Sequence, residues 1–119
     1  MEMDLRILVK ENGGVPVIEL GGELDAYTCS RLRDTMIEVI ENGNPTVIVS
    51  MLKVEYIDSS GLGTLVGGLK RASESNGRIA VVCTSPQIRK VFEITGLVRV
   101  FPLYESEQEA TNDLKTKVA

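Results

Sequence analysis

The chain has 119 residues and a mass of 13.0 kDa, which is about the size of one domain. Its 43% of hydrophobic and 25% of charged residues are typical of a globular protein and exclude intrinsic disorder. The net charge of −4 argues against nucleic acid as the main partner, because proteins that bind a phosphate backbone are usually basic. The sequence has no histidine, so it lacks the commonest general base and the commonest metal ligand.

The two cysteines are too few for a disulfide scaffold or a zinc site. We interpret Cys29 and Cys83 as small buried apolar residues. Residues 1–6 lack the basic start and the apolar run of a signal peptide, and no apolar segment approaches the roughly 20 residues that span a bilayer. We therefore expect a cytoplasmic protein that binds no metal and no membrane.

The first part of the chain predicts a β-hairpin followed by a helix. Two apolar runs, at 5–9 and 15–20, flank Asn12-Gly13-Gly14, whose residues tolerate the positive φ of a tight turn. Residues 21–25 are expected to end the second strand. Apolar residues at helical spacing then predict a helix over residues 28–41 that stops at Gly43: Leu32, Met36, Ile37 and Ile40.

The middle of the chain predicts two buried strands around a long helix. Residues 46–52 and 79–83 are continuously apolar at their centres, which indicates strands covered on both faces. Between them, apolar residues from Leu62 to Ala72 recur at helical spacing and give the strongest helical signal in the sequence. The pair Asn76-Gly77 is expected to end this helix.

The last part predicts a helix, an edge strand and a final helix. Ser85-Pro86 opens the first of these helices. Residues 98–103 predict a short strand, which Pro102 confines to a sheet edge. Ser106 with Glu109 forms a capping box for the final helix. Its apolar face is thin, so we expect weak packing and fraying; it consists of Ala110, Leu114 and Val118.

The predicted order is β-β-α-β-α-β-α-β-α, in which strands and helices alternate after the hairpin. This pattern indicates an α/β fold with a small mixed sheet of about 4–5 strands flanked by about 4 helices. We find no linker or repeat, so residues 1–119 are expected to form a single domain. No long amphipathic seam is visible, and we expect a monomer.

Residues 58–63, Asp-Ser-Ser-Gly-Leu-Gly, lie where a predicted strand meets the clearest helix. Asp and Ser are favoured N-caps, so capping is the simplest explanation. However, three consecutive capping residues followed by two glycines exceed what capping needs, and each glycine in a helix costs about 1 kcal/mol relative to alanine. This excess suggests that another molecule approaches the backbone here.

Catalysis and nucleotide binding do not fit this segment. A serine nucleophile needs a base, but histidine is absent and so is the Gly-x-Ser-x-Gly elbow. Val66 stands where the dinucleotide motif requires its third glycine. A serine at this junction could instead be a substrate for phosphorylation, which adds about −1.5 to −2 charges. The helix end would tolerate that charge, whereas a partner docked over it would be repelled.

The sequence resembles STAS-domain proteins, and among them bacterial anti-sigma-factor antagonists, over nearly the whole chain. The residues that carry the resemblance are Gly22-Glu23-Leu24-Asp25, Tyr56 to Gly63, Ser85 to Phe92 and Thr95-Gly96-Leu97. The resemblance implies a small sheet flanked by helices. It also implies a partner that is both an anti-sigma factor and a serine kinase, which the unphosphorylated antagonist captures so that the sigma factor is released.

The resemblance further implies that the kinase uses ATP to phosphorylate the first serine after the aspartate, which is Ser59. A PP2C-type phosphatase would reverse this step. The chain itself would be no enzyme and would need no cofactor. We expect a partner-binding surface around Ser59 formed by its neighbours in the two motifs: Asp25, Asp58, Ser60, Gly61 and Gly63.

Other interpretations remain open at this point. Asp25 and Asp58 could act only as helix caps. Gly61 and Gly63 could be present only because the turn has no room for a larger side chain. The chain could also be a STAS interaction or scaffold module that is never phosphorylated. A small enzyme or ligand-binding domain is a third possibility, which a deep polar pocket would support.

Overall fold

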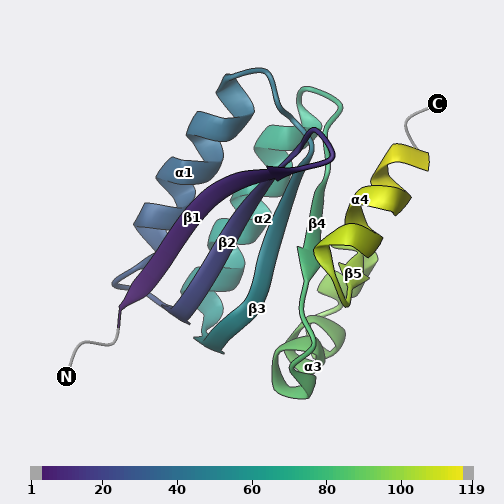
Figure 1. The fold of residues 1–119 in the computed structure, drawn as a ribbon. Helices are drawn as coiled ribbons and strands as arrows, with labels where there is room; N and C mark the ends of the chain where they lie inside the picture. The colour runs from purple at the N-terminus through teal and green to yellow at the C-terminus, as the bar shows by residue number, and fades with distance from the viewer. Residues whose placement is uncertain (1–3, 117–119) are drawn as a thin grey trace.

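The computed structural model describes residues 4–116, and these form a mixed β-sheet with helices on both faces (Figure 1). The strands are β1 (Leu5–Asn12), β2 (Val15–Leu24), β3 (Val47–Ile57), β4 (Ile79–Val82) and β5 (Leu103–Tyr104). The helices are α1 (Cys29–Glu41), α2 (Ser59–Ser73), α3 (Pro86–Ile94) and α4 (Glu107–Thr116), with a 3₁₀ turn η1 at Leu97–Arg99. The predicted order of strands and α-helices is confirmed.

The sheet has the strand order β1-β2-β3-β4-β5. β1 pairs with β2 in antiparallel fashion, and the remaining neighbours pair in parallel. α1 and α2 lie side by side behind the sheet in the view of Figure 1, and α4 packs on the opposite face, beside β4 and β5. Because β2, β3 and β4 are parallel, the loops that follow them leave from the same edge of the sheet. In such sheets this edge is the usual place of a binding site.

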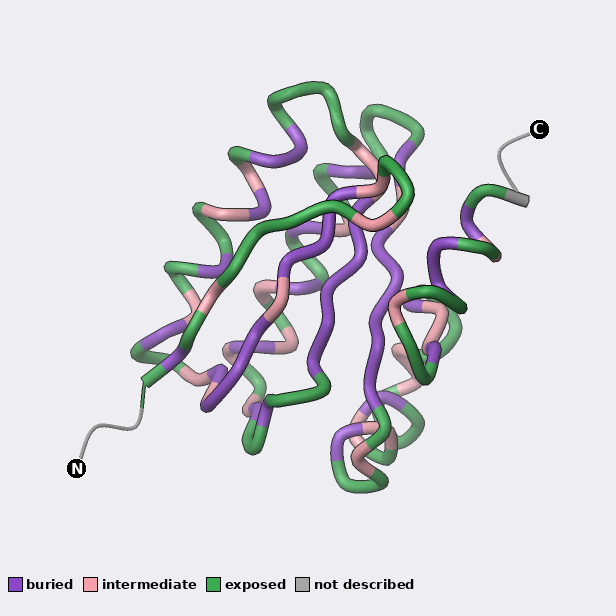
Figure 2. Tube along the Cα trace, viewed as in Figure 1, coloured by how far each residue is buried: buried purple, intermediate pink, exposed green. Residues whose placement is uncertain are grey.

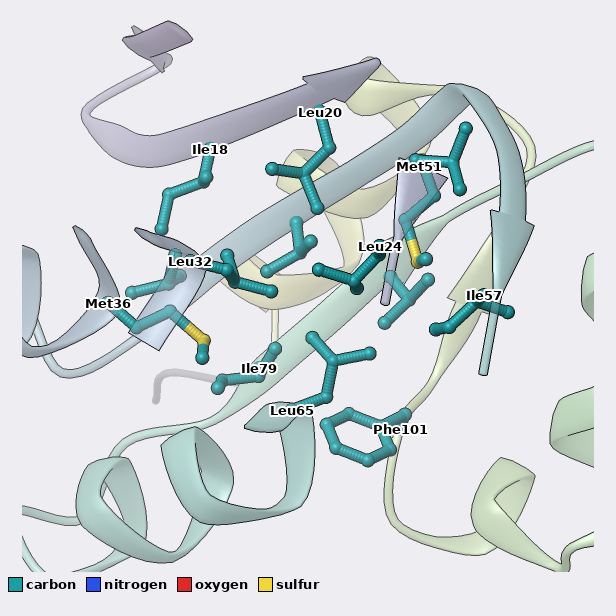
Figure 3. Close-up of a cluster of buried hydrophobic side chains, with 14 of the residues drawn as sticks. Ile18, Leu20, Leu24, Leu32, Met36, Met51, Ile57, Leu65, Ile79 and Phe101 are labelled. Atoms are coloured by element: carbon teal, nitrogen blue, oxygen red, sulfur yellow. The ribbon is translucent and has the colours of Figure 1, made fainter. Parts of the chain in front are cut away.

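The main hydrophobic core lies between the sheet and the layer of α1, α2 and α3 (Figures 2 and 3). Figure 3 shows Leu20, Leu24, Met51 and Leu65 directed toward one another in its centre. A smaller core lies under α4 and consists of Val17, Ile48, Ala80, Val82, Tyr104, Ala110 and Leu114. Side chains of β3 enter both cores, which confirms a strand covered on both faces.

The hairpin turn is confirmed, but β2 is longer than predicted. Gly13 and Gly14 have φ angles of 61° and 88°, as a two-residue hairpin turn requires. β2 does not end at residue 20 but runs on to Leu24 through two register shifts. Gly22, at φ 99°, makes this possible, because it lies directly against the carbonyl of Asp4 where a side chain would not fit. β3 likewise continues past residue 52, to Ile57.

The prediction of a strand over residues 98–103 is wrong in its extent. Only Leu103–Tyr104 pairs with β4, at the sheet edge as expected. Gly96, at φ 80°, turns the chain into η1, and the carbonyl of Leu97 accepts the N–H groups of Val100 and Phe101. The aromatic ring of Phe101 is thereby buried edge-on against Phe92, with the ring centres 5.9 Å apart.

α4 packs more closely than its thin apolar face predicted. The side chain of Ser106 accepts the N–H of Glu109 at 3.1 Å, so the predicted cap is present. Ala110 and Leu114 are both fully buried against the sheet, which contradicts weak packing at these positions. Val118 lies outside the described residues. Tyr104 supplies the missing apolar surface, and its hydroxyl donates a hydrogen bond to Asp113.

The two cysteines differ in their surroundings. Cys83 is buried as predicted, whereas Cys29 is only half-buried at the start of α1, and both are free thiols. Burial raises the pKa of the Cys83 thiol, which favours its neutral form. Within residues 4–116, none of the helices has the length and apolar composition of a membrane span.

Candidate functional site

The junction between β3 and α2 carries the motif that the sequence singled out. Asp58 has extended backbone angles and is the N-cap of α2. Its carboxylate accepts the N–H of Gly61 at 3.1 Å, and its carbonyl accepts the N–H of Leu62 at 3.0 Å. The capping role of Asp58 is therefore confirmed, and the cap is the aspartate rather than a serine.

Ser59 is the first residue of α2 and is exposed. Among the described residues, no hydrogen bond of its hydroxyl group is found, and the side chain that caps α2 is that of Asp58. Ser60 is half-buried, and its carbonyl accepts the hydroxyl of Thr64 at 3.0 Å. The two serines thus differ: the hydroxyl of Ser59 faces solvent beside a helix N-terminus, whereas Ser60 lies closer to the body of the protein.

Asp25 lies in the loop between β2 and α1 and is half-buried. Its carboxylate accepts the N–H groups of Tyr27 at 2.9 Å and Thr28 at 3.1 Å, and its own N–H donates to the hydroxyl of Thr28 at 3.0 Å. The same hydroxyl donates to the carbonyl of Glu23 at 2.9 Å. Asp25 therefore holds the turn that leads into α1, but it is not the helix cap, because the N-cap position of α1 is Thr28.

These two loops meet at one edge of the sheet. Leu24 and Ile57 are paired at the ends of β2 and β3, and the N–H of Asp58 donates to the carbonyl of Leu24 at 3.2 Å. Asp25 and Asp58, which follow these two residues directly, thus leave from neighbouring positions on the same edge. The structure brings together the two acidic residues that the sequence assigned to different motifs.

Two exposed aromatic residues flank these loops, and the sequence analysis missed them. Tyr27 is 93% exposed in the β2–α1 loop, and Tyr56 is 48% exposed near the end of β3. Exposed aromatic side chains are enriched in protein interfaces, because they combine a large apolar surface with a polar tip. The available signal was their position in a chain with only five aromatic residues: Tyr56 begins one motif, and Tyr27 follows the other by two residues.

The glycines of the motif have different roles. Gly61 is buried, and a β-carbon there would lie 2.8 Å from Cγ of Leu24 and 3.0 Å from Cγ1 of Ile57. Packing within the chain therefore accounts for Gly61. Gly63 is exposed, and a β-carbon there would meet nothing within 4 Å. Of these two glycines, only Gly63 offers its backbone to another molecule.

No group of three or more acidic or cysteine side chains that could hold a metal ion is found in the part of the chain that the structure describes. The site consists instead of a capped helix end, an outward serine, two ordered carboxylates and exposed aromatic rings. This arrangement suits contact with another protein.

The model of the STAS domain family matches residues 6–110. The chain therefore belongs to the STAS domain family, and the fold expected from the motifs is confirmed. Among its relatives is the anti-sigma F factor antagonist of Paenibacillus polymyxa, which is 31% identical over 114 residues. The match covers 95% of this chain and 97% of that relative.

Solved structures of similar proteins bear related names. An anti-sigma factor antagonist from Mycobacterium paratuberculosis superposes with a TM-score of 0.88 at 27% identity, over 97% of each chain. The cell fate determinant SpoIIAA of Bacillus, solved in its phosphorylated form, superposes with a TM-score of 0.72 at 28% identity. That match covers 92% of this chain and 99% of SpoIIAA.

Proposed function

We propose that this chain is an anti-sigma factor antagonist whose binding is switched off by phosphorylation of Ser59. The observation that carries the proposal is the hydroxyl of Ser59, which is exposed at the start of α2 and relieved of capping by Asp58. The relatives named as anti-sigma factor antagonists, one of them solved in a phosphorylated form, support the same assignment.

In the unphosphorylated state, the partner is an anti-sigma factor that also acts as a serine kinase. The proposed contact surface combines Asp25, Asp58, Ser60 and Gly63 with the exposed ring of Tyr27. Gly61 is buried below this surface and supports it indirectly, because it allows α2 to pack closely against Leu24. Capture of the kinase by this surface frees the sigma factor.

In the phosphorylation step, the hydroxyl oxygen of Ser59 forms a bond to the γ-phosphorus of ATP, ADP leaves, and the hydroxyl proton passes to a base. The kinase supplies the ATP and the base, so this chain is a substrate and not an enzyme. The phosphoserine carries about −1.5 to −2 charges, which the N-terminus of α2 tolerates. Because Asp58 lies beside it, the new charge makes the docking face strongly negative and repels the partner.

A PP2C-type phosphatase restores the hydroxyl group and completes the cycle. The chain acts as a monomeric domain in the cytoplasm, where sigma factors meet RNA polymerase. The contact with the kinase has to be reversible, so it suits a modest interface with a polar rim rather than an obligate apolar one.

The test compares Ser59→Ala and Ser59→Asp in binding to the anti-sigma factor kinase of the same cell. With ATP present, Ser59→Ala should stay bound while the wild-type chain is released, and Ser59→Asp should bind weakly from the start. Ser73→Ala, at the exposed opposite end of α2, is the matched control and should behave like the wild-type chain. Intact-mass analysis with fragment mapping should find the phosphoryl group on Ser59.

Equal binding of Ser59→Ala and Ser59→Asp, together with the absence of phosphate on Ser59 under all growth and stress conditions, would contradict the switch. The chain would then be a STAS interaction module that is not phosphorylated, and Ser59 would be an ordinary first residue of a helix.

A further inference from the structure

A groove of about 370 Å³ runs along the outer surface between α1 and α2. It begins beside the candidate site, because Ser60 is one of the residues that line it. The residues that matter for its chemistry are Arg33 and Ile37 of α1 and Ser60, Thr64, Gly67 and Arg71 of α2. No sequence motif pointed to this groove, since its two walls come from different helices.

The charged groups of the groove are positive. Arg33 is exposed, and no ion pair of its guanidinium group is found among the described residues. Arg71 has a single long contact, 3.6 Å, to the exposed carboxylate of Glu41. None of the described residues that line the groove carries a carboxylate. The groove is therefore a cationic surface in a chain whose net charge is −4.

The glycines of α2 leave this groove open. Packing within the chain accounts for glycine at position 68, since a β-carbon there would lie 2.6 Å from Sδ of Met36. At Gly63 and Gly67, which lie one helical turn apart on the groove, a β-carbon would meet nothing within 4 Å. Glycine is a poor helix former, so these two positions lower the stability of α2 without any gain in internal packing. They do allow a second chain to approach the helix backbone closely.

We propose that the groove between α1 and α2 binds an acidic segment of the partner protein, with Arg33 and Arg71 as the groups that pair with its carboxylates. Guanidinium groups form paired hydrogen bonds with carboxylates, and the hydroxyl groups of Ser60 and Thr64 add polar contacts between them. The chemistry of the walls selects this occupant, because an apolar helix would cover both guanidinium groups and offer them no carboxylate. The proposal rests on the proposed function and specifies the chemistry of the partner.

The groove also explains how one phosphoryl group can release the partner. Ser59 directly precedes Ser60, so a phosphate on Ser59 stands at the mouth of the groove. A dianion there repels an incoming carboxylate and competes with it for the nearest arginine. Release then follows from direct electrostatic competition and requires no change of fold.

The test uses acetylated hexaglutamate as the probe and the full chain labelled with ¹⁵N. Titration should shift the backbone amide signals of Gly63, Thr64 and Gly67 more than those elsewhere. The double variant Arg33→Glu/Arg71→Glu should weaken binding by about tenfold or more, since two exposed ion pairs are replaced by repulsion. Arg99→Glu is the matched control, because Arg99 is an exposed arginine of η1 outside the groove.

A second arm adds Ser59→Asp, which should weaken hexaglutamate binding, while Ser73→Ala, an exposed serine of α2 outside the groove, changes it little. Gly67→Leu fills the groove and should abolish the shifts without lowering the melting temperature. The proposal is overturned if the probe does not bind, if its shifts lie elsewhere, or if Arg99→Glu weakens binding as much as the double variant. These outcomes do not depend on the kinase, so their failure is distinct from failure of the Ser59 switch.

Discussion

The carboxylate of Asp58 and the backbone N–H of Gly61 form a hydrogen bond of 3.1 Å, and this contact fixes the start of α2. On its other side, Gly61 packs against Leu24 and Ile57, the last residues of two neighbouring strands. The helix end is thus held by the cap and by the sheet edge together. Ser59 lies between these two constraints without taking part in either, so modification of its hydroxyl leaves both intact.

Removal of the cap should lower stability. We expect Asp58→Ala to reduce the free energy of unfolding by about 1 kcal/mol, because the N–H of Gly61 loses its acceptor. Asp58→Asn keeps an acceptor oxygen and should cost less. Urea unfolding followed by circular dichroism measures both. An equal loss in the two variants would mean that the negative charge, and not the hydrogen bond, stabilises the helix end.

Gly61→Ala should destabilise the protein. The added methyl group would lie 2.8 Å from Cγ and 2.9 Å from the carbonyl oxygen of Leu24, so α2 must shift away from the sheet edge. Overpacking of this kind costs about 1–3 kcal/mol. The same urea experiment gives the magnitude, and a neutral or stabilising effect would show that α2 can move without penalty.

Gly67→Ala is the matched control within the same helix. No atom lies within 4 Å of a β-carbon there, so only helix propensity changes. We expect the free energy of unfolding to rise by up to about 1 kcal/mol. If Gly61→Ala lowers the free energy of unfolding and Gly67→Ala raises it, then the fold requires glycine at position 61 but not at position 67.

Phosphorylation of Ser59 should hardly change stability. The charge is added at an exposed helix N-terminus, where the helix dipole is worth about 0.3–1 kcal/mol, and the nearby carboxylate of Asp58 opposes it. Differential scanning calorimetry of Ser59→Asp and of the phosphorylated chain should give melting temperatures close to that of the wild type. A large drop would indicate that release acts through unfolding of α2 rather than through repulsion at the surface.

The order of elements could be predicted from the sequence, and so could the place of the Asp58-Ser59 motif where a strand meets a helix. The helices that begin at Ser59 and Pro86 have clear caps, which are Asp58 and Ser85. The positive φ angles of Gly13 and Gly14 could be predicted because these glycines lie between two apolar runs. Local patterns were sufficient here because each signal and the structure that it determines lie within a few residues of one another.

The errors arose where distant contacts decide the local structure. β2 continues past Gly21 because it pairs with both β1 and β3 there, and no local pattern records such pairing. α4 packs well because Tyr104 and Val17 complete its thin apolar face. The groove could not be predicted from the sequence for the same reason. Arg33 and Arg71 are distant in sequence and line one groove only because α1 packs against α2.

The packing of α4 should contribute substantially to stability. Leu114 is 1% exposed in the smaller core, so Leu114→Ala should cost about 2–5 kcal/mol. Lys115→Ala, at the exposed neighbouring position, should stay within about 0.5 kcal/mol of the wild type. Urea unfolding of both variants is the measurement. A small effect of Leu114→Ala would restore the expectation that α4 packs weakly.

Tyr104 should make stability depend on pH in the alkaline range. Burial, together with the hydrogen bond to Asp113, raises the pKa of Tyr104 from 10.0 to about 12. Because the folded state holds the proton more tightly than the unfolded state, the stabilisation is complete below pH 10.0 and is lost as the pH rises toward about 12.

Tyr104→Phe removes the titrating group and isolates this effect. The difference in unfolding free energy between the wild type and Tyr104→Phe should be constant below pH 10.0 and should shift against the wild type as the pH approaches about 12. Tyr27→Phe is the control, since that ring is 93% exposed and should leave the pH profile unchanged. Denaturant titrations across this pH range provide the measurement. Parallel profiles for the wild type and Tyr104→Phe would mean that Tyr104 ionises as readily in the folded chain as in the unfolded one, and that its contact with Asp113 does not fasten α4 to the sheet.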